Sequence, residues 1–165
     1  MKAHFEMMAG YNAWANRQLF AAVAERPAEE RGRDLGAAFG SLFGTLNHLA
    51  VADLIWLARL RGQRPPPFGL DHVLHDDFAE LTAARRVLDD DIIRYVDGLT
   101  GDGLAGEIAY TRVTRPEPVR QPLTEALAHF FNHQTHHRGQ AHALLTRLTG
   151  NAPALDLIFY QREAT

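Results

Sequence analysis

At 165 residues, with 46% apolar and 22% charged residues, the chain has the composition of a globular protein that is long enough to bury a core. The formal net charge is −3 with acidic and basic residues interspersed, which excludes the basic footprint of a nucleic-acid-binding domain. The absence of cysteine excludes a disulfide framework and restricts any metal site to histidine, carboxylate or water ligands.

The N-terminal stretch and the hydropathy of the chain predict where the protein is located in the cell. The N-terminal stretch MKAHFEMMAGYNAW has no apolar core of a secretory signal, and no run approaches the roughly 18 apolar residues of a membrane span. We therefore expect a single domain over residues 1–165, soluble and cytoplasmic, with a small molecule rather than a membrane or nucleic acid as its partner.

The first predicted helix covers residues 3–26, where apolar side chains recur every three or four positions. Pro27 interrupts it, and the polar residues 29–34 are predicted to form a loop. The segment also carries a group of aromatic and amide side chains, which we interpret as core aromatic residues beside two solvated amides: Tyr11, Trp14, Asn12 and Asn16.

A second helix is predicted over residues 37–61, with a broad apolar stripe that includes Phe39. His48 lies on the opposite side, which is also apolar, so its imidazole needs a partner: a carbonyl, a carboxylate or a metal ion. Asp53 falls within the stripe, and a buried carboxylate is rarely left unpaired. We expect Asp53 either to pair with an arginine or to orient a histidine.

The middle of the chain predicts a proline-rich loop, a third helix and a hairpin. We assign no site to the loop over residues 61–74, and we expect His72 and His75 to be exposed to solvent. The third helix starts at a cap, Asp76 or Asp77, and ends near residue 99. Its acidic run, residues 89–91, is interpreted as a solvated face. Alternating residues then predict a small hairpin within 107–123.

The fourth helix, predicted within residues 121–150, carries five of the nine histidines. His133 and His137 are four positions apart, roughly 6 Å along the axis and about 40° around it, a spacing at which two imidazoles can bind one metal ion. The other three are interpreted as solvated surface residues: His129, His136 and His142. A short closing helix is expected to follow, with Leu155, Ile158 and Phe159 packed inward.

Four long helices with short and medium connections predict an all-α fold, a four-helix bundle with a small hairpin before the last long helix and a short C-terminal helix. Bundles of this kind often hold metal sites between facing helices.

Two stretches resemble a known family. LNHLAVADLIWL at residues 46–57 and HFFNHQTHHRGQAHALL at 129–145 resemble the DinB family (the DinB/YfiT-like superfamily), and AGYNAWAN at 9–16 fits the first helix of that family. The resemblance covers nearly the whole chain and implies a four-helix bundle that holds a divalent ion by three histidines. On this chain these are His48, His133 and His137.

Three histidine ligands leave an open coordination position, which is typical of a catalytic metal. Zinc or nickel is the expected ion, although iron and manganese accept the same ligands. Gln140 and Arg138 are candidates to bind a ligand, or are structural.

Relatives in the wider superfamily use low-molecular-weight thiols such as bacillithiol or mycothiol, so the resemblance implies a metal-dependent thiol S-transferase or a hydrolase. The alternatives are a non-catalytic module that binds a small ligand or metal, and a structural metal whose coordination Asp53 completes. Family members often pair through bundle helices, so a homodimer is expected.

Overall fold

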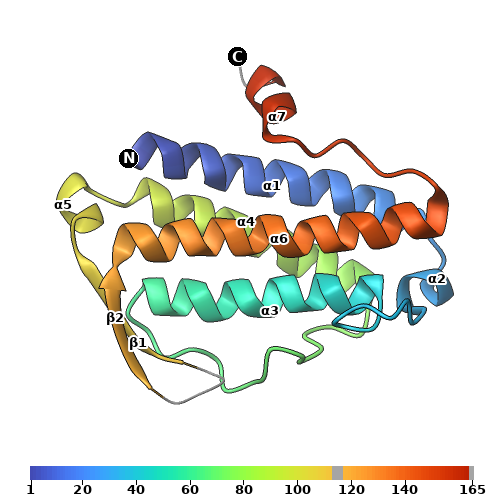
Figure 1. Cartoon of the computed structure of the whole chain (residues 1–165), viewed down its shortest axis with the longest axis horizontal. Coiled ribbons are helices and arrows are strands. Elements are labelled where there is room, and N and C mark those ends of the chain that lie inside the picture. Colours follow the sequence, from blue (N-terminus) through green and yellow to red (C-terminus); the bar gives the residue numbers. More distant parts are fainter. Residues whose placement is uncertain (113–116, 164–165) are drawn as a thin grey trace.

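The computed structural model describes residues 1–112 and 117–163, in which four long helices lie side by side (Figure 1). They are α1 (Lys2–Ala24), α3 (Leu42–Leu60), α4 (Phe78–Asp97) and α6 (Leu123–Thr149). α1 packs most extensively against α4, and α3 against α6. The predicted all-α bundle is therefore confirmed.

The hairpin and two of the short helices lie at the ends of the bundle. The strands β1 (Glu107–Thr111) and β2 (Pro118–Pro122) form an antiparallel hairpin in which Ala109 faces Arg120, and this hairpin leads into α6. α5 (Gly101–Leu104) precedes the hairpin, and α2 (Ala28–Gly32) lies at the opposite end of the bundle (Figure 1). The predicted hairpin is confirmed, whereas the loop expected at residues 29–34 contains a helical turn.

Local sequence signals set the ends of the helices. The Ser41 hydroxyl accepts a hydrogen bond of 3.0 Å from the Gly44 amide, so α3 begins at Leu42, and the predicted start at residue 37 is wrong. Asp77 caps α4 in the same way, at 2.9 Å from the Glu80 amide, as predicted. Gly150, with φ of +75°, ends α6 in the left-handed conformation that glycine adopts without strain.

The C-terminal segment packs on the outside of α1 rather than into the core (Figure 1). The Tyr11 hydroxyl donates to the Leu155 carbonyl at 2.7 Å, and the Trp14 indole donates to the Glu163 carboxylate at 2.7 Å. In α7 (Leu157–Glu163), Ile158 and Phe159 are 47% and 38% exposed. The prediction that these two side chains pack inward is wrong, because the bundle core is already closed by the four long helices.

The apolar core has two main parts, one on either side of a polar layer, and a smaller third cluster of Tyr11, Trp14 and Ala15 lies under the C-terminal segment. The part toward the hairpin includes Leu57, Ile92 and Phe130, and the part toward α2 includes Leu46, Leu81 and Leu145. Between them, all four long helices contribute buried polar side chains: Asn12, Asn16, Asp53, Arg85, Asp89, Gln134 and Arg138. None of the described helices combines the length and the apolar character that a membrane span requires.

Candidate metal centre

The packing of α3 against α6 brings three histidines together. His48, His133 and His137 each offer a nitrogen, and these atoms all lie within 4.8 Å of one another. The Nε2 atoms of His48 and His137 are 3.4 Å apart, and the ring centres of His133 and His137 are 4.3 Å apart. These are the same three residues that the family resemblance implied.

Hydrogen bonds orient two of the rings. The Nδ1 atom of His48 lies 2.7 Å from the Leu70 carbonyl oxygen, and Nδ1 of His137 lies 2.8 Å from Oε1 of Gln140. If Nδ1–H donates in each pair, the lone pair of Nε2 is left for a ligand, as is usual in metal-binding histidines. Gln140 therefore contacts a candidate ligand directly. The loop over residues 61–74, to which no site was assigned, supplies the carbonyl that orients His48.

An aromatic ring covers one face of His48. Phe39 stacks on it with ring centres 3.7 Å apart and planes 13° from parallel. The sequence placed Phe39 on the stripe of the second helix, but it lies in the turn before α3. That position lets the ring reach over His48 and limit the rotation of the imidazole.

The surroundings of His48, His133 and His137 favour the neutral form of all three imidazoles. Burial lowers the pKa of His133, with further contributions from His137 and His48, to about 3. Burial also lowers the pKa values of His48 and His137, and the hydrogen bonds to Leu70 and Gln140 oppose that shift only in part. Neutral imidazole is the form that binds a metal ion, so protons do not compete for the site near neutral pH.

This donor set fits a divalent ion. Three nitrogen donors lie within 4.8 Å of one another, and Nδ1 of His133 is buried without a hydrogen-bond partner among the described residues. The three-nitrogen set suits zinc and nickel. Asp53 is not part of the group, so the described residues give no sign of a fourth protein ligand of the kind that closes a structural site.

The remaining histidines of α6 lie outside the group. His136 is exposed and its Nε2 lies 3.2 Å from the Gln140 amide nitrogen, while His142 contacts the Pro153 carbonyl at 3.0 Å. His129 is exposed but also packs against Trp56, with ring centres 4.8 Å apart. In the loop before α4, His72 is exposed as predicted, whereas His75 is half-buried and lies 3.3 Å from Glu80.

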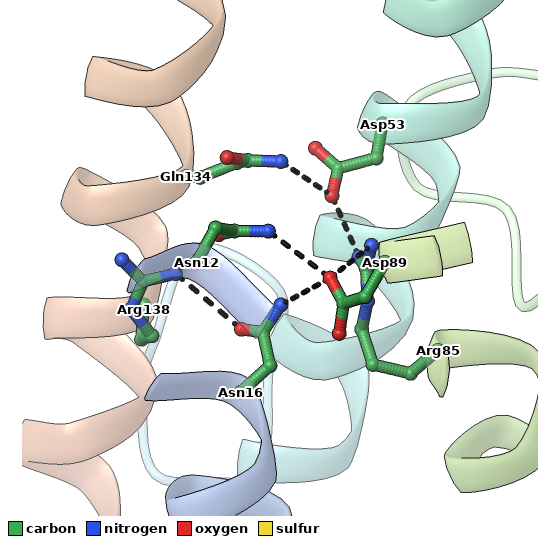
Figure 2. Close-up of polar contacts among 7 residues, drawn as sticks. All are labelled: Asn12, Asn16, Asp53, Arg85, Asp89, Gln134 and Arg138. Carbon is green, nitrogen blue, oxygen red and sulfur yellow. Dashed lines mark hydrogen bonds and ion pairs between the residues drawn. The ribbon is translucent and has the colours of Figure 1, made fainter. Parts of the chain in front are cut away.

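The polar layer lies directly beside the three histidines, because Gln134 and Arg138 each follow a candidate ligand on α6. Figure 2 shows its contacts. Asp53 accepts hydrogen bonds from Arg85 at 2.6 Å and from Gln134 at 2.9 Å, and Arg85 also forms an ion pair of 2.9 Å with Asp89. The layer holds two arginines and two aspartates, so its buried charges balance.

The α1 amides link the two halves of the layer. Asn12 and Asn16 donate to Asp89 at 3.0 and 2.9 Å (Figure 2). Arg138 donates to the Asn12 side-chain oxygen at 2.5 Å. The prediction that these amides and Asp89 are solvated is wrong: they are 2%, 3% and 5% exposed. The pairing of Asp53 with an arginine was one of the two alternatives that the sequence left open.

Charge and burial oppose each other in this layer. Burial raises the pKa values of the Asp53 and Asp89 carboxyl groups, and the Arg85 charge opposes that shift. Burial also works against the charge on Arg85, but Asp89 and Asp53 outweigh it and raise the pKa of that guanidinium. Arg85 is therefore the cation that both carboxylates require, and its role was not predicted from the sequence.

A cavity of about 440 Å³ opens beside the histidines. His133 lies in its wall, together with side chains from α3, α6 and the hairpin: Ile55, Trp56, Arg59, Tyr110 and His129. A small molecule in this cavity can reach the histidine group at one end.

The fold and the site define a class of protein, a four-helix bundle with a three-histidine group between two facing helices. The sequence profile of the DinB family matches residues 1–165, so the chain belongs to the DinB family. It is also similar to Protein DinB of Bacillus subtilis (strain 168), with 27% identity over 154 residues that cover 87% of this chain and 85% of that protein. No solved structure matches the chain.

Proposed function

We propose that this DinB-family protein is a metal-dependent enzyme that acts on a small molecule, as a thiol S-transferase or a hydrolase. The observation that carries the proposal is the open group of three neutral histidines beside a cavity. His48, His133 and His137 would hold a divalent ion, with zinc or nickel as the best candidates. Such an ion supplies Lewis acidity, which lowers the pKa of a bound thiol or water molecule toward about 7.

The side chains of this chain have separate roles in the proposal. Gln140 and the Leu70 carbonyl orient the imidazoles, and Phe39 shields His48 from water. The polar layer fixes the backbone of α6 beside His133 and His137 through Gln134 and Arg138. The cavity walls enclose the substrate, and a low-molecular-weight thiol is the proposed cosubstrate of a transferase.

Metal content per chain tests the first part of the proposal. Protein purified without an affinity tag is analysed for bound metal as wild type and as His48→Ala, His133→Ala, His137→Ala and His136→Ala. We expect the first three variants to lose the ion and the matched control His136→Ala, which lies outside the group, to keep it. Retention of the ion by His48→Ala would contradict a site shared between α3 and α6.

Turnover tests the second part. The metal-loaded protein is assayed with an electrophile, 1-chloro-2,4-dinitrobenzene, and a cellular thiol, and separately with ester and amide substrates. A non-catalytic module that binds a small ligand is the second candidate, favoured by a ligand that stabilises the protein and is recovered unchanged. The homodimer stays a prediction, which sedimentation equilibrium of the purified chain would test.

A further inference from the structure

Arg59 lies at the far end of the cavity from the histidine group. It follows His48 by eleven residues on α3, close to three full turns, so both side chains lie on the same side of the helix. The guanidinium carbon lies 4.7 Å from the centre of the Trp56 ring and 4.5 Å from that of Tyr110. A line of rings therefore runs from His133 past His129 and Trp56 to Arg59.

The charge of Arg59 is buried without a counter-ion in the described part of the chain. The residue is 7% exposed, and no carboxylate of residues 1–112 or 117–163 lies within 4.0 Å of its nitrogens. Among those residues, Nη2 donates one hydrogen bond, of 3.3 Å, to the Thr111 carbonyl, and Nε is buried without a partner. A buried, unpaired guanidinium is costly, and Arg85 shows how this chain otherwise avoids that cost.

The other charged side chains of the cavity wall do not share this environment. Arg112 is exposed and forms an ion pair of 3.7 Å with Glu117, and Glu125 is exposed at the rim. The guanidinium of Arg59 lies over the rings of Trp56 and Tyr110, where its delocalised charge forms cation–π contacts. These contacts do not use the N–H donors in the guanidinium plane, so those donors can bind an oxyanion.

We propose that Arg59 binds the carboxylate of the substrate while the reactive group of the same molecule lies at the three histidines. This inference rests on the proposed function, since it names a substrate class for that site. Trp56, over which the guanidinium lies, is eight residues from His48, a rise of about 12 Å. The substrate is then an elongated monocarboxylate whose reactive group and carboxylate are separated by about that distance.

The test measures binding to metal-free protein, so it does not depend on turnover. In a Trp14→Phe background Trp56 is the sole tryptophan, and its fluorescence reports on the cavity. Octanoate and octanamide serve as probes of equal length that differ in charge. We expect octanoate to bind about tenfold more tightly, because only the carboxylate forms charge-assisted hydrogen bonds.

Variants assign that preference to one residue. Arg59→Met keeps the apolar stem and should bind both probes equally, and Arg59→Lys should keep a reduced preference because it retains the charge but not the planar fork. Arg61→Met, which is not in the cavity wall, is the matched control and should keep the full preference. Equal binding of the two probes by the parent protein, or a full preference in Arg59→Lys and Arg59→Met, would overturn the proposal.

Failure of this proposal is distinguishable from failure of the proposed function. One outcome is a protein that shows a carboxylate preference dependent on Arg59 and yet binds no metal at His48, His133 and His137. That result would support the anion site at Arg59 and contradict the proposal of a metal-dependent enzyme. If Arg59→Met does not fold, the octanoate preference of the parent protein and of Arg59→Lys decides the result.

Discussion

Replacement of Asp53 by asparagine removes one charge from the polar layer and almost no volume. The side chain is 1% exposed, and its Oδ2 accepts hydrogen bonds from both Arg85 and Gln134. After the change, the arginines Arg85 and Arg138 face Asp89 alone, so the layer carries a net charge of +1. Loss of one partner of a buried ion pair costs about 3–5 kcal/mol, and the lower value applies here because asparagine leaves no cavity.

A loss of this size is a large fraction of the free energy of unfolding of a domain, which is of the order of 5–15 kcal/mol. For 165 residues it corresponds to a decrease in Tm of roughly 9 °C, at about 2.1 cal/mol/K of unfolding entropy per residue. The assay is urea unfolding of the metal-free protein, monitored by far-UV circular dichroism. We expect the m-value to be unchanged. Asp90→Asn, at an exposed position of α4, is the control and should change the stability by less than about 0.5 kcal/mol. A similarly small effect of Asp53→Asn would refute the reasoning, since it would mean that Arg85 does not depend on this carboxylate.

Three further predictions concern the histidine group. Burial lowers the pKa values of His48, His133 and His137, so protons should compete only weakly with the metal ion. Between pH 7.5 and pH 6, metal affinity measured by competition with a chelator should fall by much less than the roughly 50-fold expected for three ordinary histidines. A full loss of roughly 50-fold would contradict the neutral state of the three imidazoles. The folded pKa of His133, about 3, lies below its unfolded value of about 6.5, so the unfolded chain takes up the proton first and the metal-free protein should lose stability as pH falls from about 6.5 toward 3. His133→Gln should flatten this dependence in urea titrations, and an unchanged slope would assign the dependence to other groups. Finally, a Cβ at Gly44 would lie 2.1 Å from the Phe39 carbonyl oxygen, so Gly44→Ala should displace Phe39 from His48, destabilise the protein by more than about 1 kcal/mol and weaken metal binding. Gly139→Ala, where a Cβ has open space on α6, is the control and should be neutral or stabilising in the same two assays.

Helical periodicity predicted the elements that have strong local signals. The four long helices, the Asp77 cap and the hairpin all follow from residue spacing and turn residues. The spacing of His133 and His137 on one helix also predicted that they lie together. The juxtaposition of His48 with them depends on how α3 packs against α6, and only the family resemblance supplied it.

The polar layer was harder to predict because most of its partners come from other helices. Asn12 and Asn16 are indistinguishable from surface residues within α1, since the Asp89 carboxylate that they contact is at least 73 positions away. Arg85 did carry a signal, because it lies on the apolar stripe of α4 between Leu81 and Leu88. A cation on such a stripe indicates a buried carboxylate nearby, and Asp53 was that carboxylate.

The polar layer also constrains the order in which the chain folds. During synthesis α1, α3 and α4 are complete before α6, and together they contribute Asp53 and Asp89 against Arg85 alone. A three-helix intermediate that closed on itself would therefore bury a net charge of −1, which is unfavourable without a counter-ion. Arg138, which is 126 positions from the amide that it contacts in α1, supplies the missing charge only when α6 docks. We expect the nascent bundle to stay open until then, so that α6 closes the core and brings His133 and His137 to His48 in the same step.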